Sequence, residues 1–518
     1  MRSVNAKFIH ITLLLSSSCL NACGGASVPA STLAAAPAPV ITSAGTDFYL
    51  TLPDHLCVSD PSQCNYAPVT NKMIVAAATA TTGEVTFNGV ITPFSVAAGA
   101  ETVITLDPAV VLIANETVEA KGIHVTALSP VSVDVVSESA TSADGYLALP
   151  TPGLGTNYYV MSYASTRYTG SEFAVVATQN NTAVTITPSA AGATKLAGVA
   201  FKVLLNIGET YQLENPANAD MTGTLVSANK PIAVFSGHRC TDIPSGIDSC
   251  DYLVEQLPDV TLWGKTFHTS LFSGRARYTV RVIASQNGTT FTTFTTMPTG
   301  LITGKLNAGQ FADVVLTGAA EFVSNNPVLM AQFMRGNTDD AAGKGDPSMV
   351  IVTPAELGTT DATFGVHGLA GTTLDYMNVV TETAALGTLK LDNVVVNAAL
   401  FTPIGGTSIY STGTIPVAPG AHSLLGTVPF SALVYDFGIS LDAVSYAYPV
   451  ATKLSWPAAA VTLTPTTTVC GTDQQNEDQQ NRQAKDQNSA KDIDHPSQTG
   501  LATPSYQGAE NDDGQECH

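Results

Sequence analysis

The stretch that decides the fold runs from Asn229-Lys-Pro-Ile-Ala-Val-Phe-Ser-Gly-His-Arg-Cys240 through Cys250-Asp-Tyr-Leu-Val-Glu-Gln-Leu-Pro258 to Trp263-Gly-Lys-Thr-Phe267. Its β-branched and aromatic runs favour strands. Proline has no N–H to donate, so we expect Pro231 at the first residue of a strand. Weaker versions of the same pattern occur elsewhere in the chain. We therefore interpret the stretch as a joint between consecutive copies of one unit.

Working outward from this joint, similar landmarks return about every hundred residues. A strand ending in Leu-Pro or Thr-Pro opens each unit, a glycine turn follows, and a proline-led strand closes it. The opening strands are Tyr49-Leu-Thr-Leu-Pro53, Tyr146-Leu-Ala-Leu-Pro150, Val254-Glu-Gln-Leu-Pro258 and Val350-Ile-Val-Thr-Pro354. The turn glycines are Gly99, Gly208, Gly309 and Gly420, and the closing prolines are Pro130, Pro231, Pro327 and Pro429. We predict four tandem β-repeats over residues 45–142, 143–250, 251–345 and 346–463.

The composition predicts an all-β protein. Charged residues make up only 12% of the 518 residues, and short runs rich in Thr and Val alternate with Gly, Asn and Pro. A chain of this length exceeds one ordinary core. We expect each repeat to form a two-layer, sandwich-like unit. In the alternative, each repeat supplies two four-stranded blades and the repeats close into a β-propeller.

The net charge of −21 argues against a nucleic-acid partner, because phosphate recognition requires a basic surface. Residues 1–22 are typical of a signal peptide: a basic start, then an apolar run too short to span a membrane. The end of this segment, Leu20-Asn-Ala-Cys23, resembles the lipobox of bacterial lipoproteins. We therefore predict a lipid anchor on Cys23, an outer-membrane or cell-surface location, and an Ala/Pro/Ser-rich tether over residues 23–44. The alternative is an ordinary secretory signal that leaves Cys23 free.

Eight cysteines, less Cys19 in the signal and Cys23 at the lipid site, leave an even set. In an exported protein such a set predicts disulfides. The pairs closest in sequence are Cys57 with Cys64, Cys240 with Cys250, and Cys470 with Cys517. Residues 464–518 are rich in Thr and then in Gln, Asn and Asp, and we expect them to be disordered.

The motif Gly237-His-Arg-Cys240, with Cys250-Asp-Tyr-Leu-Val-Glu-Gln-Leu-Pro258 and Trp263-Gly264, resembles the N-terminal domain of IgGFc-binding protein. That family is named from a large mammalian mucus protein and is also found in bacterial surface proteins. The resemblance implies extracellular binding rather than catalysis. The mucus protein continues into cysteine-dense von Willebrand-type domains, which nothing here resembles, so binding of immunoglobulin Fc does not transfer with the resemblance.

Two groups of side chains are candidates for binding. The first lies at the joint, where the loop either presents a recognition surface or serves only to pin the chain and pack adjacent repeats. The second is a strand face of tyrosines, which suits sugar or protein contacts but is also common in half-buried strands. The joint residues are His238, Arg239, Asp242, Asp251, Glu255 and Trp263, and the tyrosines are Tyr159 and Tyr163.

A third cluster, Asn337, Asp339, Asp340 and Asp346, lies between the third and fourth repeats. Oxygen-rich loops can hold calcium, but the spacing is not that of an EF-hand. We predict no cofactor and keep calcium as the alternative. The sequence contains no Gly-x-Ser-x-Gly elbow, no His-Glu-x-x-His and no dinucleotide fingerprint, so we predict no catalytic residues and no enzyme.

The sequence therefore predicts a surface-anchored bacterial lipoprotein that acts as a non-catalytic binding or adhesion module. Its expected ligand is an extracellular glycoprotein or a glycan. Two alternatives remain: a structural scaffold of the cell envelope, and a carbohydrate-active enzyme, whose paired carboxylates would meet only in the fold.

Overall fold

The structure, a computed structural model, describes residues 40–455 except 248–249, 296–300, 341–342, 344, 370–374, 406–407 and 438–443. From Ile41 onward, these residues belong to one compact unit. Antiparallel strands build it, and the one α-helix in the described ranges, α1 (Leu56–Ser59), has four residues. The all-β prediction is confirmed. The predicted signal peptide, Cys23, most of the tether, Cys470, Cys517 and the tail lie outside the described residues.

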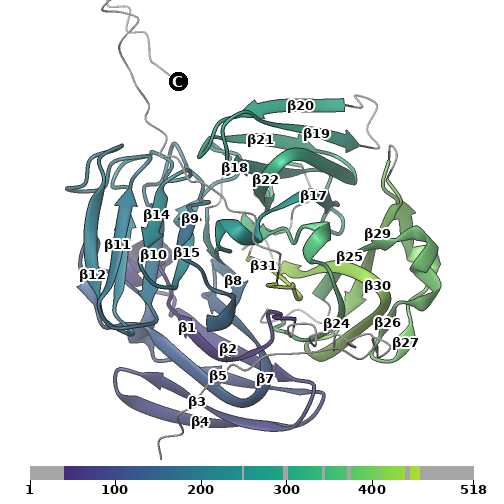
Figure 1. The fold of residues 1–518 in the computed structure, drawn as a ribbon, viewed down its shortest axis with the longest axis horizontal. Helices are drawn as coiled ribbons and strands as arrows, with labels where there is room; N and C mark the ends of the chain where they lie inside the picture. Colours follow the sequence, from purple (N-terminus) through teal and green to yellow (C-terminus); the bar gives the residue numbers. More distant parts are fainter. Residues whose placement is uncertain are drawn as a thin grey trace, which may run out of the picture. The chain divides into compact units, whose positions relative to one another are not determined.

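The strands form four units with the same pairing scheme (Figure 1). In each unit the first half of a long strand pairs with the unit's first and third strands. Its second half pairs with the second strand and with a short central strand. The third strand also pairs with the fourth, and the second with the fifth. Four copies of one motif would give this scheme; the repeat boundaries remain predictions.

The first strands are β1 (Gly45–Leu50), β9 (Asn157–Tyr159), β17 (Gly264–Thr269) and β24 (Thr359–Val366). The second are β2 (Thr70–Ala77), β10 (Ser171–Ala177), β18 (Tyr278–Ala284) and β25 (Asp375–Glu382). The third are β3 (Thr81–Phe87), β11 (Thr182–Thr187), β19 (Thr289–Thr295) and β26 (Lys390–Leu391). The fourth are β4 (Val90–Val96), β12 (Phe201–Leu205), β20 (Leu301–Leu306) and β27 (Val394–Val395). The fifth are β5 (Ala100–Thr105), β13 (Thr210–Glu214), β21 (Phe311–Leu316) and β29 (Tyr410–Val417).

The long strands are β7 (Ile123–Glu138), β14 (Leu225–Ala228) continued by β15 (Ile232–Thr241), β22 (Ala320–Met334) and β30 (Gly420–Phe437). The central strands are β8 (Ala143–Leu147), β16 (Asp251–Gln256), β23 (Ser348–Ile351) and β31 (Ser445–Pro449). Two short strands, β6 (Val118–Glu119) and β28 (Phe401–Pro403), extend sheet edges. The 3₁₀ turns are η1 (Pro61–Cys64), η2 (Pro108–Val110), η3 (Thr151–Gly153), η4 (Val260–Leu262), η5 (Ala355–Leu357), η6 (Thr383–Thr388) and η7 (Ala398–Leu400). In the part of the chain that the structure describes, no helix is both long and apolar enough to cross a membrane.

The interruption of the strand pairing near the middle of each long strand explains the recurrent proline. Pro130, Pro327 and Pro429 lie inside β7, β22 and β30, so our expectation of a strand's first residue was wrong for these three. The ladder to the first strand shifts register at each of these places, and a residue without an N–H fits such an interruption. Pro231 lies in the break between β14 and β15, immediately before the first residue of β15 rather than at it.

The predicted opening strands and turn glycines do not all occupy equivalent positions in the first and fourth units. The strand that begins the first unit, β1, pairs with the first half of β7, as β17 and β24 do with their long strands. The other predicted opening strands are central strands, and the fourth central strand is β31, which ends at Pro449. Gly420 likewise begins a long strand, whereas the other three glycines stand in the turn before a fifth strand, each with positive φ. Local patterns resembled one another where the pairing partners differ.

Each unit encloses a core between the two halves of its sheet, and the next unit covers that core from outside. This follows from strand geometry, because alternate side chains point to opposite faces. The second unit gives Val176, Phe235 and Tyr252 to the first core, and the third gives Ile283, Phe333 and Met349 to the second. The fourth gives Tyr435, Phe437 and Ala447 to the third core, and the first gives Ile74, Val136 and Ala143 to the fourth. The packing therefore closes from the last unit to the first.

The two architectures considered from the sequence describe different levels of this arrangement. Within a unit, two sheet halves face each other across a core, as in a sandwich. Between units, the central strands contact one another in a closed series, β8 with β16, β16 with β23, β23 with β31 and β31 with β8. Such a closed series is what a propeller requires. In Figure 1 the labels of β8 and β31 lie near the middle of the view.

Gly237 shows why the joint motif contains a glycine. It lies in β15 opposite Val254 of β16, and a Cβ there would stand 1.7 Å from the carbonyl oxygen of Leu253. We expect Gly237→Ala to lower the free energy of unfolding by about 1–3 kcal/mol, the usual cost of overpacking. Gly387→Ala is the matched control, because a Cβ there meets no atom within 4 Å. Equal urea midpoints for the two variants would contradict this explanation.

Candidate binding face

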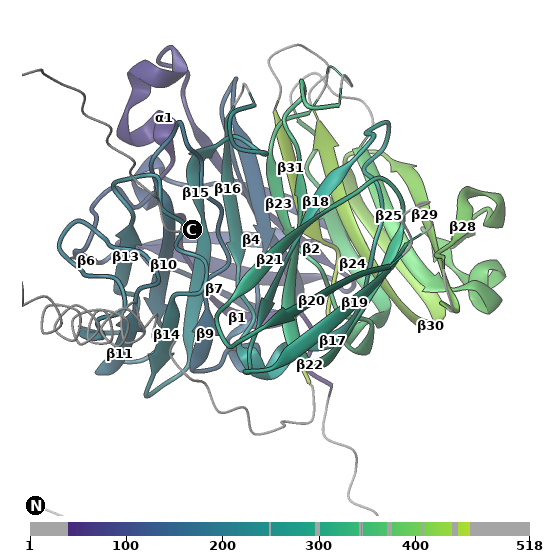
Figure 2. The same cartoon turned by 90° about the horizontal axis from the view of Figure 1, so that it is seen from above.

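The connections from the long strands to the central strands gather at one end of the sheets. We call this end the joint face: residues 139–142, 242–247, 335–340 and 345–347, with the loops 51–69, 160–170, 270–277 and 367–369 that lead towards the second strands. The Ala143 N–H donates to the Asp251 carboxylate at 2.8 Å, and the Gly336 N–H donates to the Ile243 carbonyl at 2.7 Å. The Asp346 N–H donates to the Ser445 hydroxyl at 2.7 Å. The second and third joints are therefore bonded to each other, the third joint is bonded to the first residue of β31, and the first residues of β8 and β16 are bonded to each other. Figure 2 shows α1 at this end, beside β15 and β16.

Asp144 holds the four central strands together below the joints. Its carboxylate accepts the backbone N–H groups of Val254 at 3.2 Å, Met349 at 3.1 Å and Ala447 at 3.3 Å. These donors come from the other three central strands, and the Asp144 side chain is fully buried. Burial raises the pKa of Asp144 well above the usual range. The aspartate that precedes the opening strand Tyr146–Pro150 is thus an internal cross-link.

The Asp and Glu-Gln residues of the joint motif act in the same internal way. Glu255 accepts the N–H of Ile351 at 3.0 Å, and Gln256 accepts the N–H of Leu149 at 2.8 Å. Asp251 accepts the N–H of Ala143, and burial, with the nearby Asp346, raises the Asp251 pKa well above its usual range. These side chains satisfy backbone groups of neighbouring units.

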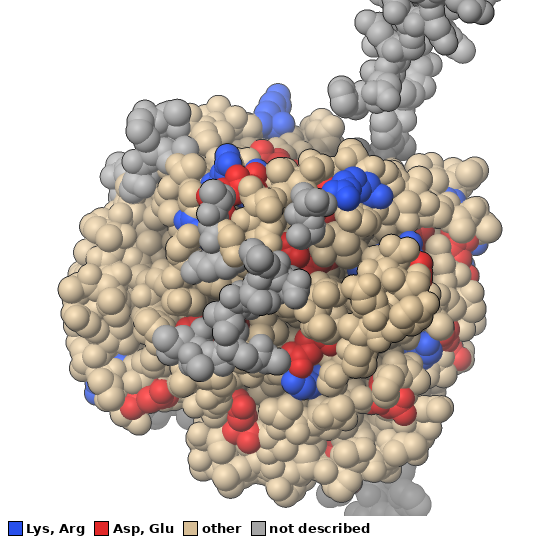
Figure 3. Space-filling view, turned by 180° about the vertical axis from the view of Figure 1, so that it is seen from behind, with Lys and Arg blue, Asp and Glu red and all other residues tan. Residues whose placement is uncertain are grey.

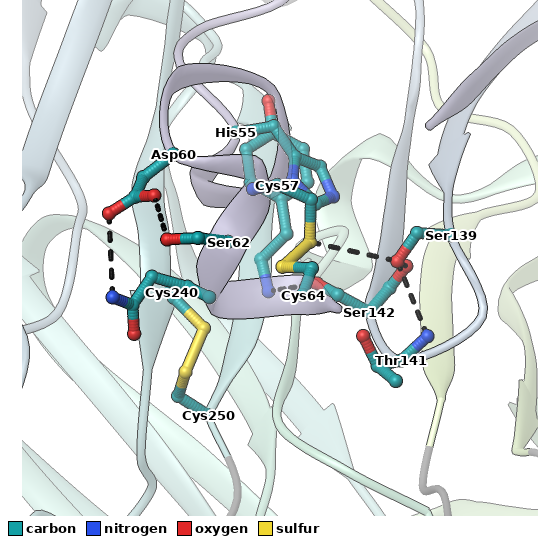
Figure 4. The surroundings of a disulfide bond; sticks show 12 residues. His55, Cys57, Asp60, Ser62, Cys64, Ser139, Thr141, Ser142, Cys240 and Cys250 are labelled. Carbon is teal, nitrogen blue, oxygen red and sulfur yellow. Dashed lines mark hydrogen bonds between the residues drawn. A yellow bond between two sulfur atoms is a disulfide. The ribbon is translucent and has the colours of Figure 1, made fainter. Parts of the chain in front are cut away.

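Two of the three predicted disulfides are confirmed. Cys57 is bonded to Cys64 across α1 and η1, and Cys240 is bonded to Cys250 across the second joint (Figure 4). The Cys57 sulfur also lies 3.8 Å from the hydroxyl of Ser139 in the first joint. Both disulfides therefore fix loops of the joint face.

A histidine stands two residues before the first cysteine of each disulfide, a His-x-Cys repetition that our interpretation of the sequence missed. The Nδ1 atoms of His55 and His238 accept the N–H groups of Cys57 at 3.1 Å and Cys240 at 3.0 Å. Burial lowers the pKa of both histidines to about 3. Both imidazoles are therefore neutral acceptors at physiological pH, so His238 contributes no charge to the face.

Arg239 lies between the first and second units. Its guanidinium is 3.6 Å from the carboxylates of Asp54 and Glu214, and its Nε donates to the Thr169 carbonyl at 3.2 Å. The neighbouring Glu172 is fully buried; burial, then the Asp54 charge, raises its pKa well above the usual range. No sequence signal pointed to the three acids around Arg239, because they come from different strands and loops.

The other predicted binding residues face inward. Trp263 packs against Tyr159, with ring centroids 6.0 Å apart, and Tyr163 lies 4.6 Å from the guanidinium of Arg281. The Arg239 side chain keeps 25% of its surface exposed, whereas the other seven residues are at most 8% exposed. Those seven are His238, Asp242, Asp251, Glu255, Trp263, Tyr159 and Tyr163. An exposed recognition surface therefore has to be built from other residues of the joint face.

Two of the acids considered for calcium, Asp339 and Asp340, are paired with arginines. Asp339 lies 2.6 Å from Arg335 and 2.9 Å from Arg277, and Asp340 lies 3.0 Å from Arg275. Among the residues that the structure describes, no group of three or more His, Cys, Asp or Glu side chains is arranged to hold a metal ion. Among the described residues of this joint, the positive charge comes from guanidinium groups.

A carboxyl pair makes the fourth unit's part of the joint face sensitive to pH. Burial and the neighbouring Asp436 raise the pKa of Asp375 to about 7. The pKa of an aspartate in the unfolded chain is about 4, so the contribution of Asp375 to stability is complete below that pH. This contribution is lost as the pH rises through about 7. We expect the melting temperature to fall less between pH 5 and 8 in Asp375→Asn than in the wild type. Asp361→Asn, at an exposed position in β24, should keep the wild-type slope; equal slopes in all three proteins would refute the assignment.

The fold and the joint face define a disulfide-bonded, all-β protein whose loops gather at one end of four interlocked units. Comparison with known families agrees with the resemblance noted in the sequence. The chain belongs to the family described as IgGFc binding protein, whose model matches residues 144–435. The match begins at the residue that links the four central strands.

Comparisons with individual proteins show weaker similarities than the family match. Human IgGFc-binding protein is 26% identical over 328 residues, which cover 61% of this chain and 6% of the human protein. A major pilin of Streptococcus pyogenes is 8% identical, covers 79% of this chain and 98% of its own, and gives a TM-score of 0.14. A Ca²⁺-stabilised, ice-binding adhesin of an Antarctic bacterium is 12% identical, with 79% and 99% covered and a TM-score of 0.11. TM-scores this low carry no argument about fold or function.

Proposed function

We propose that this protein is an exported lipoprotein, anchored through Cys23, whose joint face binds an extracellular glycoprotein or glycan without catalysing a reaction. Family membership supports the binding role, since the human relative is named for binding the Fc part of immunoglobulin G. The lipobox-like Leu20-Asn-Ala-Cys23 supports the anchor. Residues 1–22 would then be removed, and residues 23–44 would connect the lipid to the first unit.

The proposal is supported by the position of the two ends of the described chain, which lie at the end of the units opposite the joint face. The Leu454 N–H donates to the Ile41 carbonyl at 2.7 Å, so the two ends of the described chain are side by side. Ile41 packs with Leu149, Leu262 and Leu357, which follow the central strands at the end away from the joints. An anchor upstream of Ile41 would therefore connect to the units at the end opposite the joint face. Loops on a rigid scaffold are also where binding residues are usually found.

The charge pattern fits a protein or sugar ligand. On the face shown in Figure 3, uncharged residues predominate, and acidic and basic side chains lie next to one another in small groups. The arginines of the third joint are paired with aspartates rather than free to form a basic field. Such a surface does not select phosphate-rich ligands, for which clustered basic residues are required.

To test the binding role, the purified mature protein is applied to an array of secreted glycoproteins, human IgG Fc and free glycans. We expect saturable binding to members of the array. The protein could bind none of these ligands and still be degraded when intact cells are treated with protease. That result would refute the binding role and favour an envelope scaffold.

The anchor is tested by Cys23→Ser. We expect the variant to move from the membrane fraction to the soluble fraction of the producing cells, because acyl chains on this residue would supply the membrane affinity. Unchanged fractionation, or a mature N-terminus without acyl groups by mass spectrometry, would refute the lipoprotein assignment.

A further inference from the structure

An apolar hollow lies at the end of the units opposite the joint face, beside the first and last described residues. Leu147, Ile351 and Pro449, the last residues of three central strands, contribute to its lining. Including the part that is open to solvent, its volume is about 490 Å³. None of the described side chains that line it is charged, and only two of them, both threonines, carry a hydroxyl group. The hollow therefore suits an aromatic or aliphatic group and disfavours a charged one.

The last described residues run beside this hollow as an extended chain. Lys453 forms an antiparallel bridge with Thr42, which holds this part of the chain in place. Thr452 and Leu454 line the hollow, whereas Ser455 is exposed. Side chains two residues apart point to the same side of an extended chain. Every second side chain from Thr452 onward is therefore on the side of the hollow.

The sequence continues with Trp456-Pro457, so a tryptophan stands at the next position of this alternation. A residue before proline favours an extended backbone, because the proline ring disfavours the helical region for it. Two residues of chain span at most about 7 Å, so Trp456 starts within reach of the hollow that Leu454 lines. A tryptophan also has the large, mostly apolar side chain that such a hollow accepts.

We propose that the side chain of Trp456 docks in the apolar hollow of its own chain and closes it. Trp263 supplies an aromatic wall of the hollow, and its Nε1 already donates to the Pro258 carbonyl at 3.3 Å. Aromatic rings pair favourably in offset or tilted arrangements, so a second indole fits beside the first. Because Trp456 is tethered next to the hollow, its effective concentration there exceeds that of a dilute ligand from solution.

The fold already covers this end of the units with residues from the two ends of the described chain. Ile41 packs with Leu149, Leu262, Leu357 and Leu454, and the same four leucines line the hollow. The docked tryptophan extends this cover from the other end of the chain. The polypeptide that follows it then leaves the units from a fixed point beside the residues that enter them.

Fluorescence tests the docking directly, because the chain has only two tryptophans, Trp263 and Trp456. The whole chain from residue 23 onward is used, with Cys23→Ser in every protein, so that neither acyl chains nor detergent enter the hollow. The difference between this protein and its Trp456→Phe variant isolates the emission of Trp456. Tyr66→Trp, added to the Trp456→Phe variant, supplies the exposed reference, since Tyr66 is 76% exposed. We expect Trp456 to emit at shorter wavelength than in the urea-unfolded protein and to be quenched by acrylamide several-fold less than the reference.

Two further variants place a glutamate on either side of the same stretch of chain. Thr452→Glu puts the carboxylate on the side of the hollow, and Ser455→Glu, on the exposed side, is the matched control. We expect Thr452→Glu to raise the quenching of Trp456 to that of the exposed reference, because a charge is costly beside an apolar lining. Ser455→Glu should leave the quenching unchanged. Circular dichroism checks that both variants are folded.

Three results would overturn the proposal. Equal quenching of Trp456 and the reference tryptophan would show that Trp456 is not docked. Protection that persists in a folded Thr452→Glu protein would place Trp456 outside the hollow. Protection that is lost on dilution would assign the hollow to the tryptophan of a second copy. If Thr452→Glu does not fold, the comparison with the exposed reference decides alone. None of these results bears on the proposed binding function, which concerns the opposite end of the units.

Discussion

Replacing Asp144 with alanine is expected to destabilise the fold by about 3 kcal/mol or more. The change removes the acceptor for the N–H groups of Val254, Met349 and Ala447, and each buried N–H left without a partner costs about 1–3 kcal/mol. Relief of the buried carboxyl group offsets part of this loss. Because the three donors belong to three different central strands, the damage should extend to every seam between units. Urea unfolding followed by circular dichroism measures the loss.

Two comparisons make this prediction specific. Asp144→Asn keeps one acceptor oxygen, so its stability should lie between those of the wild type and Asp144→Ala. Asp361→Ala, at an exposed position in β24, should change stability by no more than about 0.5 kcal/mol. Hydrogen exchange should accelerate at the amides of Met349 and Ala447 in Asp144→Ala. Slow exchange at both, with a midpoint equal to that of Asp361→Ala, would show that Asp144 does not connect the strands.

Arg281→Met is the second change with a large expected effect, about 3 kcal/mol, because it removes the buried side of an ion pair whose two carboxylates are only partly buried. Arg281 is 3% exposed and joins the second unit to the third. Its guanidinium lies 2.6 Å from Asp220 and 2.7 Å from Asp313, and it donates to the Ser162 carbonyl at 2.7 Å. Methionine keeps the apolar stem but leaves these acceptors without their donor.

Arg281→Lys separates charge from geometry. A lysine keeps the charge but cannot reproduce the planar fork that reaches two carboxylates and a carbonyl, so we expect an intermediate melting temperature. Lys305→Met, which removes an exposed cation from β20 of the same unit, is the control and should be nearly neutral. If Arg281→Met and Lys305→Met have the same melting temperature, the ion pair does not stabilise the contact between the second and third units.

Some features were accessible from sequence because they are local. The Thr/Val-rich runs bounded by Gly and Asn indicate strands, and the even cysteines close in sequence indicate the disulfides Cys57–Cys64 and Cys240–Cys250. The joint motif identified the family. Each of these depends on residues close to one another along the chain, where chain geometry alone limits the choices.

The candidate site could not be assigned from sequence in the same way. His238, Glu255 and Trp263 were distinctive residues near a loop, and the sequence left both packing, which it favoured, and an exposed recognition surface open. Their burial is decided by neighbours in other units, such as the Ile351 N–H that Glu255 accepts. Tyr66, which is exposed, carried no pattern at all.

The sequence by itself determined the strand-rich class, the local disulfides and the family, because periodicity and spacing express the backbone's own preferences. Tertiary structure alone decided that the first unit covers the core of the last, that the joint acids bond across the central strands, and that the loops gather opposite the chain's exit. Those features depend on pairs such as Asp144 and Ala447, which are 303 residues apart. No local preference specifies such a pair; it forms because a buried N–H without an acceptor would cost the fold more than the contact does.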